Sequence, residues 1–366
     1  MAPGFKALFL FNLAVLTTFT SASFPKPSPK CRRPAERKEW RAMKKTEQAD
    51  WLRAFNCLTK LPHRDILQPT INPTTIPPVN TSSSFWDDIV YLHMDLNIRI
   101  HNTGQFLPWH RWYLHVTEKA LKEECGYRGV APYWDWTLDT PNFYSSPFFQ
   151  DSDPKSGLGG WGDPTQDFAV TDGALSQFHL SYPSPHILRR NYTAQPYLTS
   201  KSPLIPDKSI LAEETFRKED VERVVTTHDG DFKGFTADLE GPGGVHGGPH
   251  LIMGGDLGGS CPSNAPTGCR GGPTFSANDP LFQLHHAMID KLWFDWQNHH
   301  PKNKRLFHGG FAQANSSDAT DYLRSPTGKA PWLNMKTKMP ADGLFPEQEI
   351  GDVMDTTGGY LCYVYV

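Results

Sequence analysis

The chain has 366 residues, enough to bury a sizeable core, and we expect one large domain rather than two medium ones. An aromatic content of 12%, with 11 Trp and 22 Phe, excludes an intrinsically disordered protein, while 30 Gly and 32 Pro predict long loops. The formal net charge of -3 gives no electrostatic footprint for nucleic acid, for an acidic substrate or for a membrane surface.

The first residues have the pattern of a secretory signal. One lysine precedes an apolar run that ends near Phe19, and small residues follow it. The run is too short to span a bilayer comfortably, so residues 1–23 are expected to be a signal peptide cleaved after Ala22 or Ser23. An uncleaved N-terminal anchor is the alternative, and no other stretch approaches transmembrane length. We therefore expect a secreted protein whose single domain is 24–366.

Secretion changes the meaning of the cysteines, which are Cys31, Cys57, Cys125, Cys261, Cys269 and Cys362. An even count in an oxidising compartment favours three disulfides over metal thiolates. Cys261 and Cys269 flank a loop of small and turn-forming residues, so a local bridge is expected there, and the pairing of the other four stays open. Glycosylation sequons at Asn80, Asn191 and Asn315 are consistent with the secretory route.

The N-terminal third predicts helices separated by loops. Charged residues interleave with large apolar ones over 34–61, which predicts one or two amphipathic surface helices. A Pro/Thr/Ser/Asn loop follows at 67–84. Apolar residues at near-helical spacing then predict a helix over 85–98 that carries His93. An Asn-Thr-Gly sequence breaks this helix and leaves His101 in or beside a loop.

The next segments continue the helical pattern. Pro108 suits the first turn of a helix that continues through Glu123, which places His110 near a helix N-terminus. The aromatic segment 131–136 is expected to pack beneath the site. Residues 138–208 are rich in Pro, Gly, Ser and Asp and are expected to be irregular.

The C-terminal half predicts two further helices and a strand. A helix is expected over 210–227 and a Gly-rich loop over 254–272. Asp279 resembles an N-cap, with Pro280 at the first helical position of a helix through Gln297. Its apolar residues mark a buried face, on or beside which the adjacent histidines 285 and 286 lie. The last seven residues alternate weakly, which predicts a terminal strand tied down by its cysteine.

Histidines on several of these elements could share a metal. Between His246 and His250 stand two glycines and a proline, which we expect to interrupt the helix that would place both on one face. Imidazole suits copper, zinc, iron and nickel, whereas calcium or magnesium would demand carboxylates. No Asp or Glu stands at a ligand spacing, so the pattern favours a copper or zinc pair inside a helix bundle. The expected fold class is mainly α, with a central four-helix bundle holding the dinuclear site, long irregular loops and a few short strands.

Four segments carry a family resemblance: HNTGQFLPWHRWYLHVTE, PYWDW, HGGPH and DPLFQLHHAMIDKLWFDWQ. In this order they resemble the tyrosinase/polyphenol oxidase family, whose members hold a type-3 pair of copper ions, over roughly residues 31–300. In detail the chain is similar to the short, secreted, fungal-type tyrosinase-like catechol oxidases. The implied ligands of the first copper, CuA, are His93, His101 and His110. The implied ligands of the second copper, CuB, are His246, His250 and His286.

The resemblance also implies supporting roles near these ligands. His285 becomes a neighbour with a packing or orienting role, Asp290 a candidate to orient an imidazole, and Arg111 a member of a structural ion pair. Other histidines are expected to be surface or core residues rather than ligands: His115, His299, His300 and His308. Many relatives crosslink the second CuA histidine to a cysteine, but no cysteine lies between Cys57 and Cys125, so we expect no such thioether unless one of these two cysteines folds back onto His101.

Members of the family oxidise o-diphenols to o-quinones while O2 is reduced to water, so the implied partners are a small phenol, or an o-aminophenol, and O2. Members that hydroxylate monophenols tend to carry Asn after the first CuB histidine, where it positions a water with a nearby Glu. Here Gly247 stands at that place, Leu251 follows the second CuB histidine, and Glu240 resembles the water-holding Glu, with a surface acid as its alternative. Without the Asn side chain the water is held less well, so a phenol, whose pKa is about 10, would stay protonated. This favours diphenol oxidation over monophenol hydroxylation.

Three other functions stay open at this point. A true tyrosinase would add monophenol hydroxylation. An oxygen carrier resembling hemocyanin would share the six-histidine centre, but no long segment after the core is expected to cover CuB. A dizinc hydrolase would need carboxylate ligands that the motifs lack.

Overall fold

The computed structural model describes residues 30–366 except 75, 79–82, 201, 206 and 316. The expected signal peptide and the sequon at Asn80 therefore lie outside the described residues. Within the described part of the chain, no helix is both long and apolar enough to cross a membrane.

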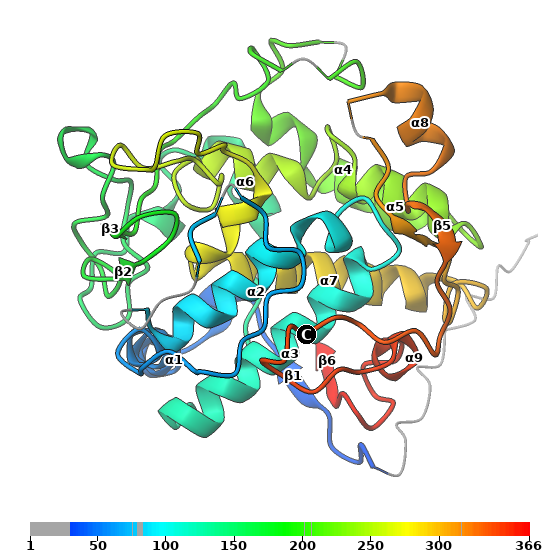
Figure 1. Cartoon of the computed structure of the whole chain (residues 1–366), viewed down its shortest axis with the longest axis horizontal. Coiled ribbons are helices and arrows are strands. Elements are labelled where there is room, and N and C mark those ends of the chain that lie inside the picture. Colours follow the sequence, from blue (N-terminus) through cyan, green and yellow to red (C-terminus); the bar gives the residue numbers. More distant parts are fainter. Residues whose placement is uncertain (1–29, 75, 79–82, 201, 206, 316) are drawn as a thin grey trace, which may run out of the picture.

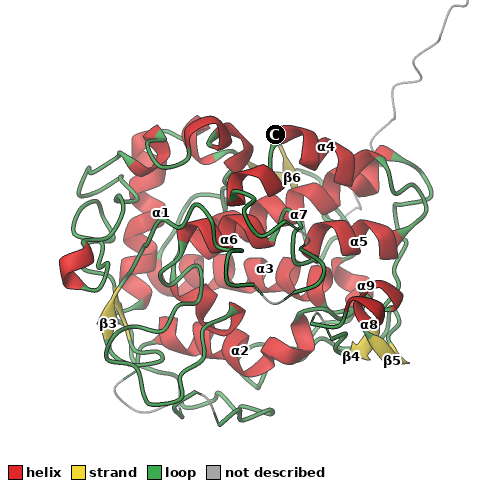
Figure 2. Cartoon of the chain, turned by 90° about the horizontal axis from the view of Figure 1, so that it is seen from above, coloured by secondary structure: helices red, strands yellow, loops and turns green. Residues whose placement is uncertain are grey.

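The fold is mainly α, as predicted. Its helices are α1 Lys45–Leu58, α2 Phe85–Ile100, α3 Phe106–Cys125, α4 Lys218–Thr226, α5 Phe232–Glu240, α6 Gly247–Met253, α7 Leu281–His299, α8 Ala319–Arg324 and α9 Ile350–Val353. Short strands pair as β1 Ala35–Arg37 with β6 Tyr363–Tyr365 (parallel), β2 His179–Leu180 with β3 His186–Ile187, and β4 Gly310–Ala312 with β5 Lys329–Trp332 (both antiparallel). The helices α2, α3 and α7 lie at the centre of the molecule, with loops around them (Figures 1 and 2).

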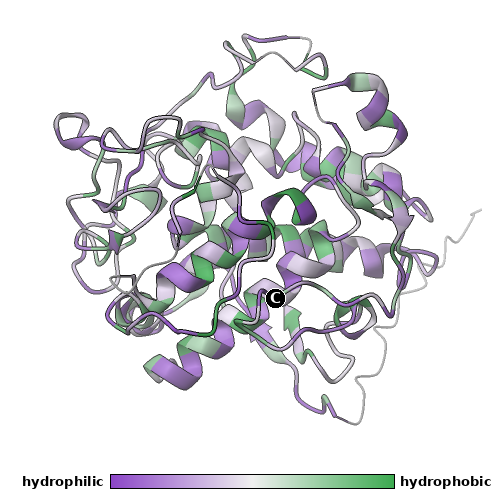
Figure 3. Cartoon of the chain, in the orientation of Figure 1, coloured by the Kyte–Doolittle hydropathy of each residue, from purple (hydrophilic) through white to green (hydrophobic). Residues whose placement is uncertain are grey.

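Local sequence explains where the central helices begin and end. The Ser84 hydroxyl accepts the amide of Asp87 at 3.2 Å, and the Asp87 carboxylate accepts the Ser84 amide at 2.6 Å, a capping box that begins α2. Gly126 ends α3 at a φ of 63°, a left-handed conformation that glycine adopts without a Cβ clash. The apolar residues of these helices form a continuous core, whereas the outer loops are mostly polar (Figure 3).

A buried charge cluster joins β1 and β6 to the central helices α3 and α7. Arg37 of β1 and Arg111 of α3 both pair with Asp290 of α7, and the hydroxyls of Tyr363 and Tyr365 of β6 donate to the same carboxylate at 2.6 and 2.5 Å. The structural ion pair expected for Arg111 is thus confirmed. The role expected for Asp290 was wrong, because its oxygens are occupied by these two arginines and two tyrosines rather than by an imidazole.

Disulfides connect the periphery to this core. Cys261 is bonded to Cys269, as predicted, and the other pairs are Cys57–Cys125 and Cys31–Cys362. Cys57–Cys125 joins α1 to the end of α3. Cys31–Cys362 lies beside the β1–β6 pair, so the predicted terminal strand is tied down by its cysteine.

Several predicted elements differ in detail from the structure. Over 34–61 the chain forms β1, a 3-10 turn and one helix, α1; the amphipathic surface helix is confirmed, because its apolar residues are buried while Lys45, Thr46 and Arg53 are exposed. The single helix expected over 210–227 is wrong: a 3-10 turn at Ala212–Thr215 precedes α4, because the Phe216 side chain turns into the core and its backbone leaves the helical region. The long irregular stretch 138–208 is confirmed apart from 3-10 turns and the two-residue strands β2 and β3.

Candidate metal centre

The first histidine group comes from two helices and the loop between them. His93 lies in the middle of α2, His101 directly follows its last residue, and His110 lies in the second turn of α3, with Pro108 in the first turn as expected. One nitrogen of each ring lies within 4.8 Å of one nitrogen of the others, and all three side chains are buried. The structure therefore brings together the three residues that the sequence places in one triplet.

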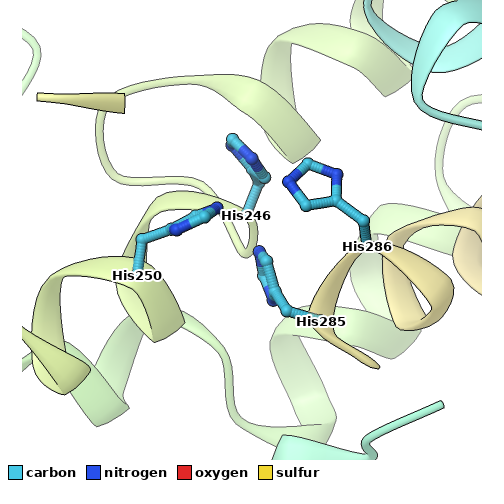
Figure 4. A group of neighbouring side chains, drawn as sticks. All are labelled: His246, His250, His285 and His286. Atoms are coloured by element: carbon cyan, nitrogen blue, oxygen red, sulfur yellow. The ribbon is translucent and has the colours of Figure 1, made fainter. Parts of the chain in front are cut away.

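The second group comes from α6 and α7. It comprises His246, His250, His285 and His286, whose nitrogens likewise lie within 4.8 Å of one another (Figure 4). Figure 4 shows the first two approaching from α6 and its start, and the adjacent pair approaching from α7. Geometry alone thus adds His285 to the three predicted members.

The expected interruption of the helix between His246 and His250 was wrong. His246 has helical dihedral angles (φ -75°, ψ -45°) and directly precedes α6, so the two histidines lie one turn apart. Pro249 is tolerated because it stands in the first turn, where backbone amides have no intrahelical acceptor. Gly248 is required here, since a Cβ would lie 2.3 Å from the Thr215 hydroxyl and 2.4 Å from the Phe216 ring.

At the other end of the group, α7 begins at Leu281, one residue later than predicted. The Asp279 carboxylate nevertheless accepts the Leu281 amide at 2.9 Å, so it performs the expected capping role. Asp279 also forms a buried ion pair with Arg190, which ties the start of α7 to the loop 138–208.

The two groups face one another across a narrow aromatic gap. The rings of His110 and His286 stack at 4.3 Å between centroids. Phe106 contacts His110 and His246 at centroid distances of 5.0 and 4.9 Å, and Phe282 lies 4.0 Å from His286. A pair of metal ions would thus lie close together in a water-poor space, and sequence reasoning gave neither phenylalanine this role, although both stand inside the family motifs.

Hydrogen bonds determine which ring nitrogens are free to bind a metal. The Nδ1–H of His101, His110 and His250 can donate to the carbonyls of Asn97 (3.1 Å), Phe106 (2.8 Å) and Leu257 (2.8 Å). This fixes the proton on Nδ1 and leaves a lone pair on Nε2. The buried Nε2 atoms of His93, His110 and His246 have no hydrogen-bond partner, as expected for nitrogens that bind a metal.

The adjacent histidines of α7 differ in this respect. The indole N–H of Trp136 donates to Nδ1 of His285 at 3.2 Å, which places the proton of the neutral imidazole on Nε2. Both ring nitrogens of His286 and the Nε2 of His285 are buried without a partner, so the two residues differ at Nδ1. Trp136 belongs to the segment 131–136, so its predicted position beneath the site is confirmed.

Burial lowers the pKa of every histidine in the two groups. For His101 and His250 desolvation brings the pKa down to about 4, despite a backbone carbonyl that raises it. Desolvation, reinforced by neighbouring imidazoles, holds the pKa of His93, His110, His246 and His286 well below the usual range. All are neutral at pH 7 and can bind a metal without first losing a proton. Neutral imidazoles without carboxylates fit copper or zinc.

A cavity of about 220 Å³ opens beside the second group and reaches the first at one residue, His101. Its polar rim includes Glu240, and its walls include Gly247 and Leu251. The rest of its lining is Asn102, Gly241, Pro242, His246, His250, Leu257, Gly258, Gly272 and Pro273. The three residues that the sequence singles out for selectivity therefore share one cavity, to whose walls the loop 254–272 also contributes.

Glu240 is a buried acid rather than a surface one, with 8% of its side chain exposed. One carboxylate oxygen accepts the backbone amide of Asn102 at 2.7 Å, and the other has no hydrogen-bond partner. Burial raises the pKa of Glu240 well above the usual range of a carboxyl, although the Asn102 amide opposes the shift.

Comparison with known proteins now decides the family. The model described as the common central domain of tyrosinase matches residues 83–299, which contain both histidine groups. The chain belongs to the tyrosinase family. Members of this family are copper oxidases with a dinuclear site, and the two groups of neutral histidines fit such a site.

Curated relatives agree with this assignment. Tyrosinase-like protein phomQ1 of Diaporthe leptostromiformis is 32% identical, and the match covers 93% of this chain and 79% of the relative. N-acetyl-6-hydroxytryptophan oxidase ivoB of Emericella nidulans is 28% identical over 90% of this chain and 91% of its own. Among solved structures, a mutant polyphenol oxidase of Thermothelomyces thermophila aligns with a TM-score of 0.66 at 24% identity, covering 93% of this chain and 91% of that one. This last similarity supports the tyrosinase-type helical core.

Proposed function

We propose that this member of the tyrosinase family is a catechol oxidase, which converts two o-diphenols and one O2 to two o-quinones and two waters. We further propose that His93, His101 and His110 hold one copper and His246, His250 and His286 hold the other. The observation that carries the preference for diphenols is the bare backbone at Gly247 beside the cavity. A site in which Asn and Glu240 together hold a water would deprotonate a phenol; Gly247 has no side chain for this purpose.

The choice of His286 over His285 rests on the proton positions. Binding a metal through Nε2 of His285 would require removal of the proton that the bond from Trp136 places there. His286 has no such bond and stacks on His110 of the opposite triplet. Trp136 is then the residue that keeps His285 in its supporting role.

The rest of the site binds and orients the substrate. The cavity is large enough for one substituted ring, and Leu251, Leu257 and Pro273 supply apolar contact. When bound, the two copper ions supply a two-electron couple that matches the oxidation of one diphenol. Glu240, whose second oxygen is free, can accept a hydrogen bond from a water or a substrate hydroxyl at the rim. A secretory location is proposed as well, consistent with three disulfides.

The test is O2 uptake by the purified protein with catechol, phenol, tyrosine and 2-aminophenol. A hydroxyindole belongs in the panel because one relative is named an N-acetyl-6-hydroxytryptophan oxidase. We expect oxidation of catechol without lag and hydroxylation of phenol at least about 100-fold slower, the scale of a missing general base. Comparable rates on both substrates would identify a true tyrosinase. Reversible O2 binding without turnover would identify a carrier.

Gly247→Asn sharpens this test. A Cβ at Gly247 meets only the carbonyl of Pro242, at 4.0 Å, so asparagine fits without displacing the helix. We expect the variant to gain phenol hydroxylation by about 10-fold or more while it keeps catechol oxidation. Gly243→Asn is the matched control, because a Cβ there meets nothing within 4 Å and Gly243 does not line the cavity. An equal gain in both variants, or none in Gly247→Asn, would contradict the role given to this position.

A further inference from the structure

Of the three predicted ligands of the first copper, His101 is the one that lies outside a helix. It stands between the end of α2 at Ile100 and the start of α3 at Phe106, and the next residue, Asn102, has a left-handed φ of 52°. A loop whose backbone is buried must pair its N–H and C=O groups outside helical hydrogen bonding. The partners of this loop therefore determine where His101 lies.

Those partners come from β4 and the residues that follow it. The side-chain amide of Gln313 donates to the His101 carbonyl at 3.1 Å, and the Ala314 amide donates to the Asn102 carbonyl at 3.0 Å. The Gly104 amide donates to the Gly310 carbonyl at 3.0 Å. Three hydrogen bonds thus hold the His101 loop against a segment more than 200 positions away in the sequence.

The two backbones also touch directly. A Cβ at Gly309 would lie 2.2 Å from the Cα of Gly104, and a Cβ at Gly104 would lie 2.8 Å from the Cα of Gly309. From β5's side, a Cβ at Gly328 would lie 2.9 Å from the Cα of Thr103. We call this set the β4–β5 brace: β4, β5, Gly309, Gln313, Ala314 and Gly328.

The brace has no covalent alternative in this chain. All six cysteines are engaged in disulfides, so none is left to crosslink the His101 ring. Each of the three rings has a backbone carbonyl at Nδ1, but the backbones of His93 and His110 are held by α2 and α3, whereas that of His101 is held by the brace. The brace also lies beyond residues 83–299, the part that matches the family model.

We propose that the β4–β5 brace positions His101 for copper, and that Gln313 is its principal positioning residue. The brace takes the place of a covalent crosslink on this ligand. Through Asn102 it also positions Glu240, because the Asn102 amide is bonded to the carboxylate while its carbonyl is bonded to Ala314. This inference rests on the proposed role of His101 as a copper ligand.

The test compares Gln313→Ala with Gln195→Ala in the copper-loaded protein. Gln195 is the matched control, since its amide also donates to one backbone carbonyl, that of Ser209 at 3.0 Å, outside the histidine groups and the cavity. We expect Gln313→Ala to release one of its two copper ions to a chelator about 10-fold faster, the lower end of the effect of losing an outer contact to a metal ligand. The release rate of the other copper ion and the melting temperature should change little. Gln195→Ala should release copper as the unaltered protein does.

Hydrogen exchange on the metal-free protein supplies a second readout. The Gly104 and Asn102 amides should exchange faster in Gln313→Ala than in Gln195→Ala, while amides of α3 stay unchanged. Gly309→Ala should have a larger effect than Gly243→Ala, whose Cβ meets nothing within 4 Å. Unchanged copper release in Gln313→Ala, or equal loss of both ions together with a lower melting temperature, would overturn the positioning role. A failure of the proposed function is recognised separately, because the unaltered protein would then bind no copper. A failure of the positioning role alone would leave copper binding by the unaltered protein intact.

Discussion

The two halves of the candidate copper centre are built differently. The first, with His93, His101 and His110, lies between two long helices and meets the cavity at His101 alone. The second combines the long helix α7 with the seven-residue helix α6, and His246 and His250, at and within that short helix, both line the cavity. Long helices with tightly packed neighbours suit metal retention. A short helix bordered by glycines leaves room for a substrate, so we expect the first half to govern copper binding and the second half selectivity.

Removal of a first-half ligand should have the largest effect. His110→Ala deletes an imidazole whose Nε2 is buried without a partner, so we expect about one copper per chain and a loss of catechol oxidation of at least about 1,000-fold, since only the pair supplies two electrons. Copper content and O2 uptake measure this. His115→Ala on the same helix is the control: His115 contacts the Tyr360 ring outside the site, so this variant should keep both copper ions. Two copper ions in His110→Ala would refute its place in the triplet.

The link between the halves should matter next, and mainly for stability. Asp290 of α7 pairs with Arg111, the residue after His110. Asp290→Asn would leave Arg111 buried without its counter-charge, while Arg37 keeps Glu118 at 3.0 Å; loss of one partner of a buried ion pair typically costs about 3–5 kcal/mol of unfolding free energy. Denaturant unfolding measures the loss. Asp295→Asn is the control on the same helix, because Asp295 pairs with the partly exposed Lys291 and should change stability by about 1 kcal/mol or less.

The ion pair between Asp290 and Arg111 also makes the free energy of unfolding depend on pH. Burial alone would raise the pKa of Asp290, but Arg111 and Arg37 outweigh it and hold the pKa below its ordinary value. A depressed folded-state pKa stabilises the protein above the unfolded-state value of about 3.9, and this stability is lost as the pH falls through the folded-state pKa. The difference in unfolding free energy between the unaltered protein and Asp290→Asn should therefore be constant near neutrality and shrink below about pH 4. If the difference in unfolding free energy between the two proteins instead grew on acidification, Asp290 would not be held as a carboxylate.

The central helices and the histidine groups were predictable because their signals are local. Apolar spacing and caps mark α2, α3 and α7, and the imidazoles stand inside recognisable motifs. The partners of Asp290 could not be predicted, because its position one turn beyond His286 suggests a contact with an imidazole. The arginines and tyrosines that occupy it come from β1, α3 and β6. Likewise nothing near His101 in the sequence indicates Gln313, since that contact exists only once β4 has paired with β5.

Glu240→Gln tests whether the second half controls the handling of phenols. Glutamine is isosteric and can still accept the Asn102 amide, so the loop that carries His101 should stay in place. We expect little change in catechol oxidation. In the Gly247→Asn background, however, the gained phenol hydroxylation should fall about 10-fold, because the amide is no base. An equal fall on both substrates, measured as kcat/KM by O2 uptake, would instead give Glu240 a role in the diphenol reaction.

The smallest effect is expected at Leu251, which lies in the cavity wall directly after His250 and is only partly buried. Leu251→Ala widens the cavity and removes contacts only at the edge of the core, against which this partly buried leucine packs, so we expect the unfolding free energy to fall by about 1 kcal/mol. The ratio of kcat/KM for a bulky 4-substituted catechol to that for catechol should rise about threefold. This is less than the roughly 10-fold or larger effect of one methylene in a closed pocket, because this cavity is open. Leu138→Ala, at a leucine 59% exposed outside the cavity, should leave the ratio unchanged. If Leu251→Ala lowered copper retention but not this ratio, selectivity and metal binding would not divide between the two halves as proposed.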